Sequence, residues 1–153
     1  MRVAARSGVV RNEPALRPAR RQVTHAIVTE HCRGGIIAVV DDDGPILRSL
    51  EILLESADYS VRSFQSGEAL LASGSLEEID CLVSDIGMSG MDGFELMRLV
   101  QAAHPGLPVI LITGQPGIMN ALAAAAAGRY RVFRKPFSGP ELLAAIDSAV
   151  AGG

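Results

Sequence analysis

The sequence predicts an α/β domain in which a five-stranded parallel sheet has helices on both of its faces. Short apolar runs alternate with segments in which apolar residues recur at steps of three and four, and this alternation occurs five times. All of the runs except the second have the composition of strands that are buried on both faces, which is typical of a parallel sheet. Connections between such strands are expected to be right-handed crossovers.

The predicted elements follow one another with short connections. In chain order they are strand 36–40, helix 46–57, strand 59–64, helix 67–71, strand 81–83, helix 94–100, strand 108–112, helix 118–127, strand 132–133 and helix 139–150. The second strand alternates polar with apolar residues, which suits the edge of a sheet.

Turn and capping residues mark several of the helix ends. Pro45 is well placed to open the first helix, because proline is favoured in the first turn. Ser66 can cap the second helix and Gly74 can end it. Ser138, with Glu141 three residues later, forms a capping-box pattern at the start of the last helix.

Charge is distributed unevenly along the 153 residues. Residues 1–35 hold seven Arg against two Glu, a balance of +5, whereas residues 36–153 hold seven basic residues against fifteen acids, a balance of −8. The first segment has no sustained periodicity, so we expect a disordered basic tail or an unselected leader. The folded domain is then expected at 36–150, with 151–153 as a short end. Because the tail lacks interleaved aromatic residues, nucleic acid is not the expected partner.

Two further features concern the compartment. The sequence has no run of eighteen or more apolar residues, so no membrane-spanning helix is predicted. The two cysteines, Cys32 and Cys81, lie in different settings and form neither a disulfide framework nor a metal motif. A reducing, cytoplasmic setting is therefore expected.

Four predicted strands end in polar groups that can carry chemistry: the acids Asp41, Asp42 and Asp43 after the first, Asp85 after the third, Thr113 after the fourth and Lys135 after the fifth. Because parallel strands end at the same edge of a sheet, these groups are expected to converge where open α/β folds place their ligands. Clustered carboxylates repel one another unless a cation lies between them, and oxygen ligands suit Mg²⁺.

This set of groups fits phosphoryl transfer, with Asp85 as the acceptor. Each group also has an ordinary interpretation. The acid triplet can be a solvated turn, the Thr hydroxyl can satisfy a local backbone group, and a Lys is usually a surface charge. Lys135 departs from that pattern, because it is the one lysine among fourteen basic residues.

Four motifs resemble those of a response-regulator receiver domain of two-component signalling, of the CheY-like and FixJ-like kind that often precedes a LuxR-type DNA-binding domain. They are V-V-D-D-D at 39–43, D-I-G-M-S-G-M-D-G at 85–93, I-T-G at 112–114 and K-P-F at 135–137. The resemblance covers about 36–150. It implies a flavodoxin-like (βα)₅ fold with strand order 2-1-3-4-5.

The resemblance also implies roles for particular residues. Asp85 would accept a phosphoryl group from a phosphohistidine, and Thr113 and Lys135 would contact the phosphoryl oxygens. Mg²⁺ would be held by Asp41, Asp42, Asp85 and the backbone carbonyl of Gly87. The Lys135–Pro136 peptide bond would be cis. The domain would not be an enzyme beyond catalysing its own phosphorylation and dephosphorylation.

The partners implied are a sensor histidine kinase or phosphotransfer protein, and a downstream protein bound through the face formed by residues 116–150. A homodimer is possible, and no output domain is expected within the chain. Three features depart from the family pattern. Ser89 stands where Pro is usual, Val132 stands where an aromatic residue is usual, and three arginines surround the fifth strand, at 129, 131 and 134.

Two alternatives remain open from the sequence. The first is a receiver-fold binding module that is not phosphorylated, which the departures at Ser89 and Val132 favour. The second is a phosphatase that resembles the haloacid-dehalogenase type, with Asp41 as nucleophile in the run Asp41-Asp42-Asp43-Gly44. That alternative leaves the motif at 85–93 without a role.

Overall fold

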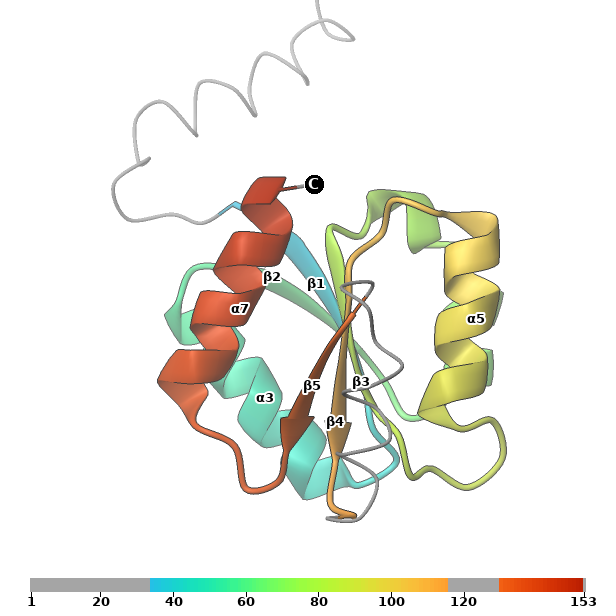
Figure 1. Ribbon diagram of the computed structural model, residues 1–153, viewed down its shortest axis with the longest axis horizontal. Coiled ribbons are helices and arrows are strands. Elements are labelled where there is room, and N and C mark those ends of the chain that lie inside the picture. The colour runs from blue at the N-terminus through green and yellow to red at the C-terminus, as the bar shows by residue number, and fades with distance from the viewer. Residues whose placement is uncertain (1–33, 116–129, 153) are drawn as a thin grey trace, which may run out of the picture. The chain divides into compact units, whose positions relative to one another are not determined.

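The computed structural model describes residues 34–115 and 130–152. Five parallel strands form one sheet in the order β2-β1-β3-β4-β5, as expected (Figure 1). The strands are β1 (Ile36–Val40), β2 (Ser60–Phe64), β3 (Cys81–Asp85), β4 (Val109–Thr113) and β5 (Arg131–Arg134). Residues 1–33 of the predicted tail 1–35, and the whole predicted helix 118–127, lie outside the described residues.

Helices cover both faces of the sheet, so the doubly wound α/β fold is confirmed. The helices are α3 (Gly44–Ser56), α4 (Gly67–Ser73), α5 (Gly93–Ala103) and α7 (Gly139–Gly152), with a short 3₁₀ turn, η2 (Leu76–Glu78), before β3. Figure 1 shows α3 and α7 on one face and α5 on the other. None of the helices in the described part of the chain has the length and apolar character needed to cross a membrane.

The core has two parts because successive strand residues point to opposite faces of the sheet. Ile37 and Val39 pack in the cluster that includes α3 and α7 residues. Ala38 and Val40 pack in the cluster that includes α4 and α5 residues. Every residue of β3 and β4 is buried, which agrees with their continuous apolar composition.

The outer strands differ from the central ones. β2 lies at an edge of the sheet and is half-buried, as predicted. The prediction that the fifth strand is buried on both faces was wrong, because Arg131 and Arg134 are exposed and Val132 and Phe133 are only half-buried. β5 forms the other edge of the sheet, paired with β4, and its arginines keep their charged heads in water.

Side-chain caps begin the described helices. Ser66 accepts from the Ala69 N–H at the start of α4, and Gly74 ends that helix in the left-handed conformation, both as predicted. The Ser138 hydroxyl accepts from the Glu141 N–H at the start of α7, as the capping pattern predicts. Asp92 caps α5 in the same way. These bonds satisfy backbone donors that a helix leaves unpaired.

Gly93 fixes the start of α5 against the end of β3. A Cβ atom at this position would lie 2.5 Å from the carbonyl oxygen of Asp85 and 2.8 Å from the Cα of Ile86. The backbone there leaves no room for a side chain, and both neighbours are main-chain atoms that cannot rotate away. The glycine therefore allows the helix to approach the strand that carries Asp85.

We expect Gly93→Ala to lower the free energy of unfolding by about 1–3 kcal/mol, because the added methyl group overpacks a main-chain contact. Chemical denaturation at a fixed pH measures this change. Gly106→Ala is the matched control, because a Cβ atom there meets nothing within 4 Å. Equal stabilities of the two variants would contradict this interpretation of Gly93.

Candidate functional site

The fold brings the predicted site residues to one edge of the sheet. Asp41 directly follows β1, Asp85 is the last residue of β3, Thr113 is the last residue of β4, and Lys135 directly follows β5. The strands are parallel, so these four positions lie at the carboxyl ends of adjacent strands in the order β1, β3, β4, β5. In open α/β sheets this edge is where ligands bind.

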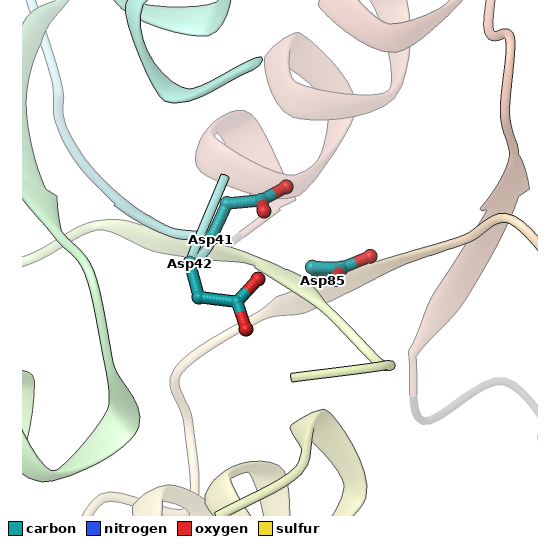
Figure 2. A group of neighbouring side chains, drawn as sticks. All are labelled: Asp41, Asp42 and Asp85. Carbon is teal, nitrogen blue, oxygen red and sulfur yellow. The ribbon is translucent and has the colours of Figure 1, made fainter. Parts of the chain in front are cut away.

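Asp41, Asp42 and Asp85 form one acidic group. Each offers a carboxylate oxygen, and these oxygens all lie within 4.8 Å of one another. Figure 2 shows the three side chains extending in the same direction, two from the chain after β1 and one from the end of β3. Asp41 is 1% exposed and Asp85 is 7% exposed, whereas Asp42 is exposed. Water therefore screens the repulsion between Asp41 and Asp85 only weakly.

Lys135 supplies positive charge to this group. Its Nζ lies 3.1 Å from Oδ1 of Asp85 and 3.5 Å from Oδ2 of Asp41. Partial burial would lower the pKa of the Lys135 ammonium. The hydrogen bond to Asp85 and the charges of Asp41 and Asp85 outweigh burial, so the pKa of Lys135 is raised above its ordinary value. The lysine is thus held in its charged form beside both buried acids.

The charged form of Asp41 is disfavoured by its surroundings. Burial raises the pKa of its carboxyl, and the negative charge of Asp85 raises it further. Two groups act in the opposite direction: the Asp43 N–H, which donates to Asp41 Oδ1 over 2.9 Å, and Lys135. The net effect is a raised pKa, which indicates that the available protein groups do not fully compensate the charge.

Asp42 and Asp43 have different surroundings from Asp41. Asp42 Oδ2 accepts from Ser89, 3.1 Å from its backbone nitrogen and 3.4 Å from its hydroxyl oxygen. Asp43 caps α3 by accepting from the Ile46 N–H over 3.2 Å, so it belongs to the helix start and not to the acidic group. Neither contact was predicted from the sequence. An Asp directly before a Gly-Pro helix start was a signal for the cap.

Thr113 is 1% exposed and lies between Asp85 and Lys135 in the order of strands. Its hydroxyl oxygen accepts from the Gln115 N–H over 3.0 Å, and its carbonyl accepts from the Lys135 N–H over 2.7 Å. The first contact is the local backbone bond that a Thr at a strand end often makes. Because the hydroxyl oxygen is the acceptor in that bond, its own hydrogen can still be donated to a ligand.

The loops that follow β3 and β5 also contribute to this edge of the sheet. Gly87 lies two residues beyond Asp85, and a Cβ atom there would be 4.0 Å from the side-chain nitrogen of Gln115. The Lys135–Pro136 peptide bond is cis, as the resemblance implied. A pocket of about 470 Å³ lies beside Lys135 and is lined by Ile46, Ser49, Gly114, Lys135, Pro136 and Phe137.

The donor set fits a hard divalent cation. Three carboxylates face a single ammonium in the group formed by Asp41, Asp42, Asp85 and Lys135. Burial, and to a smaller extent the charge of Asp85, raises the pKa of Asp41. Mg²⁺ takes few protein ligands, prefers oxygen and keeps several waters, so an edge with one exposed acid suits it. The fold and this edge define a doubly wound α/β domain with an acidic, lysine-paired site.

Comparison with known proteins assigns the family. Residues 37–147 match the response regulator receiver domain. NtrC from Klebsiella pneumoniae, a DNA-binding transcriptional regulator, is 38% identical over 117 residues, which cover 76% of this chain and 25% of NtrC. Transcriptional regulatory protein FixJ from Bradyrhizobium diazoefficiens is 35% identical over 116 residues, which cover 76% of this chain and 57% of FixJ.

Solved structures agree with this assignment. A receiver domain protein from Clostridium thermocellum superimposes with a TM-score of 0.70 at 28% identity, covering 77% of this chain and 95% of the other. The receiver domain of NtrC, in its apo form, gives a TM-score of 0.68 at 36% identity, with 77% and 95% covered. The chain belongs to the response regulator receiver domain family, whose members act in two-component signalling and generally bind Mg²⁺ at an acidic cluster of this kind.

We expect Lys135→Gln to lower the free energy of unfolding at pH 7 in metal-free buffer by about 2 kcal/mol, because it removes charged hydrogen bonds to two buried carboxylates. The loss should shrink as the pH falls. The pKa of Asp41 is already raised, and protonation relieves the repulsion that the missing ammonium leaves behind.

Urea denaturation between pH 4 and pH 8 measures this dependence. Arg134→Gln is the matched control, because it removes a positive charge from an exposed neighbour on β5. A loss for Lys135→Gln that is the same at every pH, or no larger than that of the control, would contradict the role given to Lys135.

Proposed function

We propose that this domain is a phosphoacceptor of a two-component phosphorelay and that Asp85 receives the phosphoryl group. The observation that carries the proposal is the position of Asp85, which lies at the ligand-binding edge of the sheet, 3.1 Å from the Lys135 ammonium and within 4.8 Å of two further acids. The donor would be a phosphohistidine on a sensor histidine kinase or a phosphotransfer protein. The chain covers a quarter of the length of NtrC and little more than half of FixJ, so the output of those proteins is not transferred to it.

In the proposed reaction, a carboxylate oxygen of Asp85 attacks the phosphorus of the donor. A new P–O bond forms, the P–N bond to the histidine breaks, and its electron pair stays on the imidazole nitrogen. Lys135 is close enough to Asp85 to pair with an oxygen of the transferred group. Thr113 can donate its hydroxyl hydrogen to another. These contacts neutralise charge on the equatorial oxygens, which is the main requirement of phosphoryl transfer.

Asp41, Asp42, Asp85 and the backbone carbonyl of Gly87 are the groups that would hold Mg²⁺. The ion would supply the positive charge that three carboxylates and one ammonium lack. Asp41 is buried and fixed by the Asp43 N–H and Lys135, so its part is mainly electrostatic. Asp42 is exposed and can reach the ion directly.

Two surfaces support protein partners. The pocket beside Lys135 would accept an apolar side chain of the donor protein. The output would pass through the face formed by residues 116–150, where Arg131 and Arg134 are exposed on β5 and favour an acidic partner or a second copy of the domain. We place this activity in the cytoplasm, where Cys81, a free and buried thiol, would stay reduced.

A binding module that is not phosphorylated is the second candidate. It is favoured by Val132, which is half-buried on β5 where an aromatic residue is usual in the family. The two candidates share the fold and the acidic group, and they differ in whether Asp85 becomes modified. The phosphatase alternative differs from both, because it requires a covalent group on Asp41.

We expect incubation with acetyl phosphate and Mg²⁺ to add one phosphoryl group to the wild-type protein, because Asp85 lies at the ligand-binding edge of the sheet beside the Lys135 ammonium, which can neutralise charge on the transferred group. Intact-mass spectrometry measures the adduct. Asp85→Asn should abolish it, and omission of Mg²⁺ should reduce it at least tenfold, in line with the contribution of metal ions to charge stabilisation.

Asp58→Asn is the matched control. Asp58 is an exposed acid between α3 and β2. It lies near the amino end of β2, whereas the acidic group lies at the carboxyl ends of the strands, and it has a positive φ of 70° that Asn tolerates. This variant should be modified as fully as the wild type. Absence of an adduct on folded wild-type protein would favour the binding module, and an adduct that maps to Asp41 would favour the phosphatase.

A further inference from the structure

Ser89 lies in the loop between β3 and α5 and makes two contacts with the same oxygen of Asp42. Its backbone nitrogen is 3.1 Å and its hydroxyl oxygen 3.4 Å from Asp42 Oδ2, and both groups act as donors. The residues are 47 positions apart, so the contact joins the end of β1 to the loop after β3. The N–H is the shorter contact, and a proline at this position would have no N–H to donate.

The contact matters because Asp42 is the exposed member of the acidic group. Asp41 and Asp85 are buried and held by Lys135, and Asp41 also accepts from the Asp43 N–H. An exposed Asp side chain is free to change rotamer unless a contact fixes it. The donors of Ser89 provide such a contact and leave the second oxygen of Asp42 for another ligand.

The backbone that presents Ser89 is held by contacts that do not involve Asp42. The Ile86 carbonyl accepts from the N–H groups of Met88 and Gly93, at 3.0 Å each. Met91 lies over Gly67 of α4, so closely that a Cβ atom on that glycine would be 2.9 Å from the Met91 sulfur. These contacts hold the loop independently of Asp42, so the Ser89 N–H is a preorganised donor.

We propose that Ser89 is a positioning residue for the divalent cation: it fixes the Asp42 carboxylate through Oδ2 and so raises the affinity of the acidic group for Mg²⁺. This inference rests on the proposed function, since it takes Asp42 as a metal ligand. Hydrogen bonds to a ligating carboxylate orient it, and their removal typically weakens metal binding by about 10–100-fold. A proline at the same position could not donate these hydrogen bonds to Asp42.

The test is a titration of the full chain with Mg²⁺, without any phosphoryl donor, in which the amide chemical shifts report binding. Ser89→Pro removes both donors and should weaken Mg²⁺ binding by about tenfold. Ser89→Ala keeps the N–H and should weaken binding less than Ser89→Pro. Ser56→Ala is the control for loss of a serine hydroxyl, because Ser56 bonds the Leu53 carbonyl within α3, and its affinity should equal that of the wild type. Wild-type or tighter Mg²⁺ binding by Ser89→Pro would overturn the proposal.

A second measurement keeps the proposal testable if the proline variant does not fold. The Ser89 amide proton of the wild type should move upfield in Asp42→Ala, because it loses its carboxylate acceptor, while Ser89 itself is unchanged. An amide resonance that stays in place would overturn the proposal. Failure of the Ser89 inference is distinguishable from failure of the proposed function, since wild-type protein would then still bind Mg²⁺ and form the Asp85 adduct.

Discussion

The structure depends on how like charges are held together at one edge of a sheet. Asp41 and Asp85 are nearly inaccessible to water, and Asp42 lies within 4.8 Å of both. Such a group is unfavourable unless positive charge is close by. Lys135 supplies part of that charge from the end of β5, and the two acids raise its pKa despite its partial burial, so they favour its charged form. The negative charge that Lys135 does not compensate is the basis for a cation site.

The three consecutive acids after β1 have different roles at this edge. Asp41 points into the protein and meets Lys135, Asp42 faces the loop that carries Ser89, and Asp43 caps α3. Each has a different donor, so each is fixed in a different direction. Gly93 completes the arrangement from the other side, because it lets α5 approach the main chain at Asp85. The same short segments, residues 41–43 and 85–93, therefore supply the charged groups of this edge and fix the starts of α3 and α5.

The alternation of elements and the residues that gather at the edge were predicted from local patterns in the sequence, whereas the strand order was implied by the resemblance to receiver domains. Continuous apolar runs mark β1, β3 and β4, and the direction of parallel strands then brings their ends together. The sequence did not predict the exposure of β5, since a short run containing Val132 and Phe133 has no periodicity to separate an edge from a centre. Nor did it predict the Ser89–Asp42 contact, which depends on the loop conformation between residues distant in the chain.

The most direct test of this account is the free energy of unfolding as a function of Mg²⁺ concentration, at constant ionic strength. A cation that binds the folded acidic group should stabilise it, by about 1.4 kcal/mol for each tenfold increase above the dissociation constant. The increase should be lost in Asp42→Ala, which removes the exposed ligand. A free energy of unfolding that Mg²⁺ leaves unchanged would contradict the central claim that the acids at this edge are completed by a divalent cation.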